Sequence, residues 1–231
     1  MTPERVVLAD GGRSVFCLVT PGALRAAHPT SPDARETTIV ARAIAAIHAG
    51  IDLLQIREHN LPAQSLLRLV VRLVSASRGR STRIVVNDRL DVALAAGADG
   101  VHLGGRSLPA RRVRAIVPEG FLVGCSVHSV EEARAAAGEG AADYLVAGTV
   151  FPSASKPGAT VFLGTDRLAA IAGAVAIPVL GVGGIGLDSL ADVARTGAAG
   201  VAAIGLFEDA ADLDATVRQA RRLFDTARVI S

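Results

Sequence analysis

Apolar residues occur in two kinds of segment along the chain. Short runs of β-branched and other apolar residues alternate with longer segments in which apolar residues recur at helical spacing. The short runs are typical of buried strands, and the longer segments are typical of helices that cover them. The short runs predict eight strands, at residues 15–19, 52–56, 83–87, 100–103, 121–126, 144–147, 178–182 and 201–204.

Helices are predicted between and after these strands. Ser129 and Glu132 have the spacing of a capping box, which begins a helix, and Gly97 and Gly138 stand where helices can end. Near-continuous apolar strands separated by helices predict a parallel sheet that is covered on both faces. The predicted helices lie near residues 34–49, 63–77, 89–96, 108–116, 130–138, 166–174, 187–196 and 209–226.

Eight such units favour an α/β fold of the (β/α)8 TIM-barrel type. The 231 residues suit that fold, which commonly needs about 250. The alternative is a doubly wound open sheet, which usually carries a glycine-rich nucleotide turn after its first strand. Here Thr20-Pro21-Gly22 follows the first strand instead. We therefore expect one barrel domain over residues 15–231, preceded by a short N-terminal extension over residues 1–14.

Composition narrows the classes of partner. An aromatic content of 3% argues against stacking platforms for nucleic acid bases, and a net charge of +2 with scattered arginines indicates neither a nucleic acid nor a membrane surface. Cys17 and Cys125 lie in apolar runs and are expected to be buried and reduced. Without a leader pattern or a long apolar stretch, the expectation is a cytoplasmic protein. Outer helices of such barrels often pair, so a homo-oligomer stays open.

In a barrel of this type the active site lies at the carboxyl ends of the strands. Two glycine-containing loops there, residues 181–185 and Ile204-Gly205, expose backbone N–H groups and stand where this fold often holds a phosphate. They predict a small phosphorylated substrate, although the glycines could instead only permit tight turns. Residues that follow the other strands at this mouth are Gln55, Arg57, Glu58, His59, Asn87, Asp88, His102, Gly104 to Ser107, Ser126, His128, Thr149, Ser153, Ser155 and Lys156.

Two cations stand out among these residues. Lys156 is the single lysine, since the other 23 of the 24 cationic side chains are arginines, and a compact ammonium suits a phosphate. Arg57 would bring a second cation, enough to counter a diphosphate. The alternatives are that Lys156 is a solvated loop residue, and that Arg57 forms a structural ion pair with Glu58.

Asp88 and His128 are the candidates for metal and proton chemistry. Asp88 could hold Mg²⁺, which binds through one or two carboxylates plus substrate phosphates, or it could cap the third helix. His128 could transfer a proton, because an imidazole titrates near neutral pH, or it could simply precede the Ser129 cap. The residues leave both pairs of alternatives open.

Six segments together resemble the family of thiamine phosphate synthase and its relative, thiazole tautomerase. They are QIRE at residues 55–58, VNDRLDVAL at 86–94, GVHLG at 100–104, GCSVHS at 124–129, FPSASK at 151–156 and GVGGI at 181–185. For a synthase, the resemblance implies coupling of an aminopyrimidine diphosphate to a thiazole phosphate, with Mg²⁺ at Asp88. It implies diphosphate binding by Gln55, Arg57, Asn87, Ser126 and Lys156, and thiazole phosphate binding by Ser153, Ser155, Gly183, Gly184, Ile204 and Gly205.

The chain departs from the synthase pattern in three places. His59 replaces a lysine, Ser107 stands where a second metal carboxylate is expected, and Gly205 replaces a serine. A weaker diphosphate and metal site favours the tautomerase, which needs no metal and shifts a proton on a thiazole phosphate carboxylate. In that isomerase His128 would shuttle the proton and Lys156 would support the substrate charge. A synthase is the alternative, and a non-catalytic sensor of a phosphorylated ligand is the second.

Overall fold

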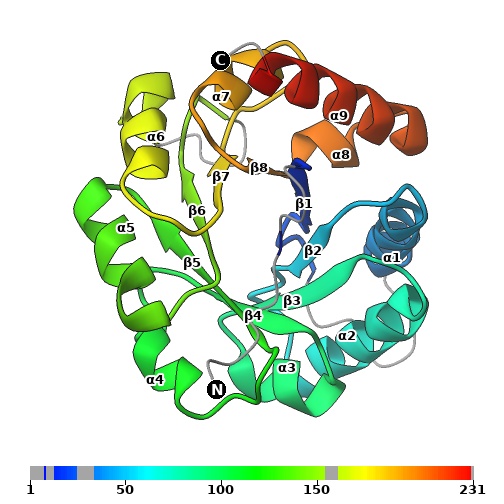
Figure 1. The fold of residues 1–231 in the computed structure, drawn as a ribbon. Coiled ribbons are helices and arrows are strands. Elements are labelled where there is room, and N and C mark those ends of the chain that lie inside the picture. The colour runs from blue at the N-terminus through cyan, green and yellow to red at the C-terminus, as the bar shows by residue number, and fades with distance from the viewer. Residues whose placement is uncertain (1–7, 9–12, 25–33, 154–160, 230–231) are drawn as a thin grey trace.

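Eight parallel strands close into a barrel in the part of the chain that the structure describes. The structure is a computed structural model that describes residues 8, 13–24, 34–153 and 161–229. Each strand is hydrogen-bonded to the next, and β8 closes onto β1 (Figure 1). The predicted TIM barrel is confirmed. The strands are β1 Val15–Val19, β2 Leu53–Ile56, β3 Arg83–Asn87, β4 Gly100–Leu103, β5 Leu122–Val127, β6 Tyr144–Gly148, β7 Val179–Val182 and β8 Gly200–Ala203.

Helices surround the barrel as an outer layer (Figure 1). They are α1 Ala34–His48, α2 Ala63–Ser77, α3 Leu90–Ala96, α4 Ala110–Arg114, α5 Val130–Ala137, α6 Gly164–Gly173, α7 Leu190–Arg195, α8 Gly205–Glu208 and α9 Leu213–Val229, with a 3-10 turn at Gly138–Gly140. Among the described residues, no helix is both long enough and apolar enough to span a membrane. The extension expected at residues 1–14 falls largely outside the described residues, so its boundary stays a prediction.

The segment after the last strand differs from the single helix expected near residues 209–226. It forms the short helix α8 and then the longer helix α9. α9 begins at Leu213 and not at residue 209, because the Oδ1 of Asp212 accepts the backbone N–H of Ala215 at 2.9 Å and so caps the helix there. The helix α8, which the sequence pattern did not predict, starts directly after the carboxyl end of β8.

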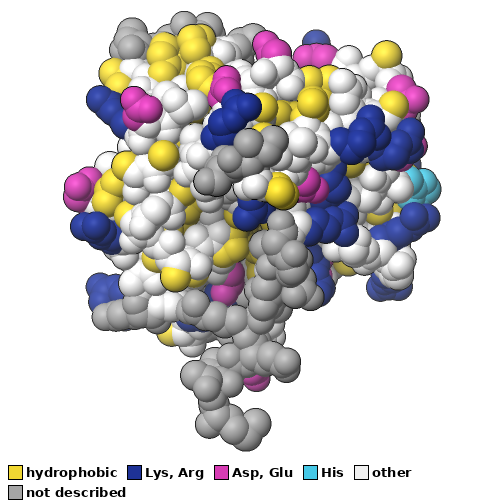
Figure 2. Space-filling view, turned by 45° about the horizontal axis from the view of Figure 1, so that its top comes forward, with side chains coloured by type: hydrophobic (Ala, Val, Ile, Leu, Met, Phe, Trp, Pro, Cys, Tyr) yellow, Lys and Arg dark blue, Asp and Glu magenta, His cyan; other side chains and the backbone are white. Residues whose placement is uncertain are grey.

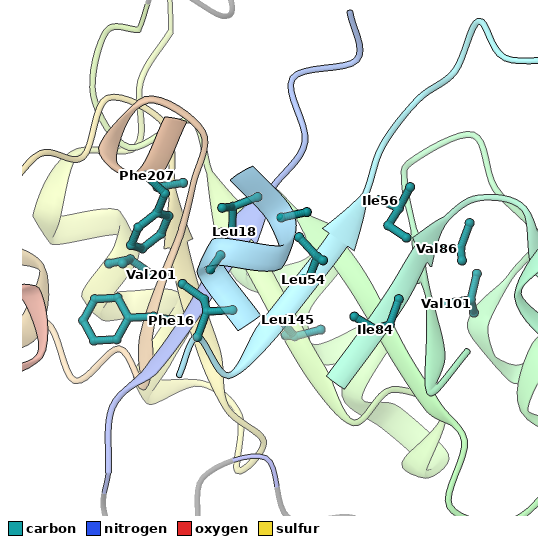
Figure 3. Close-up of a cluster of buried hydrophobic side chains, with 14 of the residues drawn as sticks. Phe16, Leu18, Leu54, Ile56, Ile84, Val86, Val101, Leu145, Val201 and Phe207 are labelled. Carbon is teal, nitrogen blue, oxygen red and sulfur yellow. The ribbon is translucent and has the colours of Figure 1, made fainter. Parts of the chain in front are cut away.

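Alternate residues of each strand face two separate apolar layers. Phe16 and Leu18 of β1 point outward and pack against the helices, and Figure 3 shows part of that cluster. Phe16 meets the rings of Phe207 and Phe224 edge-on, with centroids 6.3 and 5.9 Å away. Val15, Cys17 and Val19 face the barrel interior instead. The strands are thus fixed from both sides, which holds their carboxyl ends rigidly.

One large ring inside the barrel depends on a glycine opposite it. Tyr144 of β6 is fully buried and pairs in register with Gly124 of β5. A Cβ at Gly124 would lie 2.1 Å from the Tyr144 ring, so only glycine leaves room for it. The hydroxyl of Tyr144 is hydrogen-bonded to the ring of His102 on β4. Because His102 lines the cavity at the mouth, this bond connects the packed interior to the site.

Both cysteines are buried and reduced, as the sequence predicts. Burial raises the pKa of the Cys17 thiol to about 12 and that of Cys125 to about 11. We expect neither thiol to react with a disulfide reagent at pH 8 in the folded protein, because the thiolate is the nucleophile. Both should react at once in guanidinium chloride. Rapid modification of one equivalent in the folded protein would contradict this expectation.

Candidate active site

A cavity of about 390 Å³ opens at the carboxyl ends of the strands. It receives side chains from most of the strands, as expected for a barrel of this type. A second cavity of about 480 Å³ adjoins it over β7 and β8. Of the predicted site residues, Gln55, Arg57, Asn87, Asp88, Ser126, His128, Ser153, Gly183 and Ile204 line the first cavity, and Gly184 and Gly205 line the second. Lys156 and Ser155 lie outside the described residues.

Hydrogen bonds link the ends of three neighbouring strands. The Nε2 of Gln55 on β2 donates to the Oδ1 of Asn87 on β3 at 2.7 Å, and the Nδ2 of Asn87 donates to the Oδ2 of Asp88 at 2.8 Å. The other oxygen of Asp88 accepts the backbone N–H of Gly104 at 3.1 Å and the hydroxyl of Ser107, both after β4. These bonds fix the polar groups at this side of the mouth.

Asp88 does not cap the third helix. It has a positive φ of 60°, which is uncommon for a residue with a side chain, and its carboxylate turns toward the loop after β4. The residue that precedes α3 is Arg89, which makes no side-chain capping bond. Left-handed backbone of this kind is concentrated at functional sites, which supports a role for Asp88 at the mouth.

Arg57 and Glu58 point in different directions, so the ion pair considered above is not formed. Glu58 is buried, and its two carboxylate oxygens accept the backbone N–H groups of Gly22 at 3.1 Å and Leu24 at 2.8 Å. It therefore fastens the loop after β1. Arg57 lines the cavity, and within the described part of the chain no carboxylate lies within ion-pair distance of it. Its guanidinium is thus available to an anionic ligand.

His102 holds the hydroxyl of Ser126 in place. One ring nitrogen lies 3.2 Å from the Tyr144 hydroxyl and the other lies 2.9 Å from the Oγ of Ser126. Complete burial lowers the pKa of His102 to about 4, against a smaller opposing effect of the Asp88 charge. The ring is therefore neutral at pH 7, with one donor and one acceptor nitrogen. It acts as a support for Ser126 and does not exchange protons at neutral pH.

His128 lies at the exposed rim of the cavity. Its Nδ1 is 3.1 Å from the Oε2 of Glu132, and its backbone N–H donates to the same oxygen at 2.7 Å. The hydroxyl of Ser129 accepts the backbone N–H of Glu132 at 3.2 Å, so the Ser129 cap of the predicted capping box is confirmed, but the return bond from the Glu132 carboxylate goes to the N–H of His128 and not to that of Ser129. The local geometry therefore ties His128 to the start of α5.

The loops after β6 and β7 pack backbone against backbone. Gly183 and Gly184 both have positive φ, of 99° and 64°. The N–H of Phe151 donates to the carbonyl of Gly183 at 3.0 Å, and a Cβ at Gly184 would lie 2.2 Å from the carbonyl oxygen of Pro152. The glycines are required by this close approach, whatever ligand the loops hold.

The second cavity is acidic on one side. Glu208 and Asp209 line it together with the glycines, and none of its described lining side chains is cationic. Burial raises the pKa of Glu208, the last residue of α8. Phosphate binding by Gly183, Gly184, Ile204 and Gly205 stays a prediction that rests on backbone N–H groups.

Positive side chains elsewhere are dispersed. On the face that Figure 2 shows, arginine side chains lie at several separate places among acidic and apolar ones. Arg106, in the loop after β4, also lines the first cavity. The sequence predicts that residues 104–107 lie at the mouth. It does not predict which side chain of this turn points into the cavity. Arg106 is therefore a cavity residue to which the pattern assigned no role.

Comparison with known proteins identifies close relatives. The family model described as thiamine monophosphate synthase matches residues 28–207. A thiamine-phosphate synthase of Methanoculleus marisnigri is 43% identical over 81% of this chain and 87% of its own length. One from Anaeromyxobacter dehalogenans is 42% identical over 82% and 84%. The solved thiamine phosphate pyrophosphorylase of Pyrococcus furiosus is 30% identical, with a TM-score of 0.75 over 94% of this chain and 97% of that one.

Proposed function

Because the chain belongs to the thiamine monophosphate synthase family, we propose that it joins an aminopyrimidine diphosphate to a thiazole phosphate and releases pyrophosphate. The observation that carries the proposal is the 43% identity to a thiamine-phosphate synthase over most of both chains. The cavity supports it, because residues expected at a diphosphate site, among them Arg57, Asn87 and Ser126, line one space.

The preference for a thiazole tautomerase is wrong, and so is the isomerase class. The relatives reported above, at 42 and 43% identity, are named as synthases, which are transferases. The preference for the tautomerase rested on two positions, His59 and Ser107, where the chain lacks a charged group of the synthase pattern. The similarity to the synthases extends over most of the chain and therefore outweighs these two positions. The proton shuttle assigned to His128 belonged to the tautomerase, and its pairing with Glu132 at the rim gives that role no support.

The described residues suit a reaction that is driven by electrostatics. When pyrophosphate departs, it takes the bonding electrons and negative charge grows on its oxygens. A prearranged cation stabilises that charge best where the protein has already excluded water. Arg57 supplies such a cation. The side-chain amides of Gln55 and Asn87 are hydrogen-bonded to each other in the same cavity, where they offer donors and acceptors to the pyrimidine ring of the substrate. Ser126 is held by the neutral ring of His102 and offers an oriented hydroxyl.

Magnesium fits this site poorly. Asp88 is the one carboxylate among the described residues that line the first cavity, and both of its oxygens already accept hydrogen bonds from protein donors. Within the described ranges, no group of three His, Cys, Asp or Glu side chains could hold a metal. Two cationic side chains, Arg57 and Arg106, line the same cavity. We therefore assign no step of the reaction to a metal ion held by the protein.

The activity is tested with purified protein, the pyrimidine diphosphate, the thiazole phosphate and Mg²⁺. We expect sustained formation of thiamine phosphate, followed by chromatography. Arg57→Gln should lower kcat/KM about a hundredfold, because a donor to the developing charge is lost. Arg72→Gln removes the same charge from the exposed face of α2 and should leave kcat/KM unchanged. Binding of the thiazole phosphate without any turnover would reject the synthase and favour the sensor.

A further inference from the structure

A tight turn follows β4 at the mouth of the barrel. The backbone N–H of Ser107 donates to the carbonyl of Gly104 at 3.0 Å, and the N–H of Gly104 donates to the Oγ of Ser107 at 2.7 Å. Gly105 and Arg106 thus occupy the two central positions of a four-residue turn. Arg106 is exposed at its tip and lines the first cavity. The turn therefore presents a guanidinium at the mouth.

The turn is joined to the end of β3 by a hydrogen bond where the family resemblance places a metal bridge. The hydroxyl of Ser107 donates to the Oδ1 of Asp88, which also accepts the N–H of Gly104. Two carboxylates that faced each other here would repel and would need a cation between them. A hydroxyl donates to a carboxylate directly. With Ser107 in this position, the two loops are held together without an ion.

Among the described residues at the mouth, the side chains with a permanent positive charge are guanidinium groups. Arg57 lines the cavity from the loop after β2 and Arg106 lines it from the loop after β4, and among the described residues neither has a carboxylate within ion-pair distance. Partial burial lowers the pKa of His59, the Arg57 charge lowers it further, and Arg106 adds a smaller effect in the same direction against Asp88 and Glu58. His59 is thus a poor substitute for a lysine, and of the described residues that line the cavity the two arginines carry the positive charge.

We propose that Arg106 binds the diphosphate of the substrate together with Arg57, and that this site binds the diphosphate without needing a metal ion. The inference rests on the proposed synthase function for the identity of the anion. It goes beyond that function because it assigns a residue and a metal requirement. A guanidinium presents paired N–H donors that match phosphate oxygens, so it can offset a charge that a divalent ion would otherwise balance.

Inorganic pyrophosphate is the probe that tests this proposal without turnover. Calorimetric titration of the whole protein in metal-free buffer should show binding, and addition of Mg²⁺ should not tighten it. Arg106→Gln should weaken binding about tenfold, the size of one lost charge-assisted contact. Arg112→Gln makes the same change on the exposed face of α4, away from the cavity, and should bind like the unaltered protein. Equal binding by both variants would overturn the proposal.

A second variant tests the part played by Ser107. In Ser107→Asp two carboxylates would face each other, so we expect pyrophosphate binding to weaken in metal-free buffer and to be restored by Mg²⁺. Binding by the unaltered protein only when Mg²⁺ is present, or in neither buffer, would overturn the proposal. Pyrophosphate binding that depends on Arg106 in a protein that forms no thiamine phosphate would reject the synthase function alone, because this measurement requires no turnover.

Discussion

We expect Gly184→Ala to remove most of the synthase activity and to destabilise the fold. A Cβ at this position would lie 2.2 Å from the carbonyl oxygen of Pro152 and 2.7 Å from that of Phe151, and the φ of 64° is unfavourable for any side chain. The methyl group meets rigid backbone, so the loops after β6 and β7 must separate. Backbone strain and overpacking each cost on the order of 1–3 kcal/mol. A displacement of about 1 Å at a catalytic site can cost a hundredfold in rate.

Gly173→Ala is the matched control for this substitution. Gly173 is the last residue of α6, and an added Cβ would meet no heavy atom within 4 Å other than those of its chain neighbours and its own helix backbone. Because alanine loses less backbone entropy than glycine in a helix, this variant should be as stable as the parent or more so, by up to about 1 kcal/mol. Urea unfolding and kcat/KM measure both variants. If the two had the same unfolding free energy and activity, the close approach of the two loops would not exist.

The strands could be read from the sequence because each is short, apolar and bounded by polar residues or glycine. All eight agree with the structure to within one residue at each end. The short helix α8 was missed, and the last helix was expected to begin at residue 209 although α9 begins at Leu213, because apolar residues continue through this segment. Only the side chain of Asp212, acting as a cap, decides where the second helix begins.

For the site, the sequence predicts only what the barrel topology determines, which is the set of residues that lie at the mouth. Because all eight strands run parallel, the residues that follow them, such as Gln55, Asn87 and Ser126, must reach one mouth. Side-chain direction is a different matter. Glu58 turns away to fasten the loop after β1, and Asp88 turns to the loop after β4 because its backbone is left-handed. Neither direction follows from the spacing of residues along the chain.

The positive charge of the diphosphate site also could not be predicted from the sequence alone, as Arg106 shows. The departures at His59 and Ser107 indicated a weakened diphosphate site as long as each position was considered alone. In the structure, Ser107 bonds to Asp88 and its neighbour Arg106 brings a guanidinium to the cavity. A turn of four residues thus changes both the metal requirement and the local charge. Compensation of this kind is visible only once the groups are placed in space.

Acid should destabilise this protein through His102 in particular. Burial lowers the pKa of its imidazole from its ordinary value of 6.5 to about 4, and the ring nitrogens contact the hydroxyls of Tyr144 and Ser126. Between these two pH values the unfolded chain binds a proton at His102 that the folded chain does not. The stability from this group is therefore complete above pH 6.5 and is lost as the pH falls to about 4. The loss is on the order of 3 kcal/mol.

His102→Gln isolates this effect, because an amide keeps one donor and one acceptor but cannot take up the proton. Carboxylates also titrate in this range, and their contribution cancels when the variant is compared with the parent. Urea unfolding at pH 7.5 and pH 4.5 should show a loss of stability that is smaller in the variant by on the order of 2–3 kcal/mol. His48→Gln, on the exposed surface of α1, should lose as much as the parent. If His102→Gln also lost as much as the parent, the ring would have to be protonated in the folded protein, and its support of Ser126 through a neutral nitrogen would be wrong.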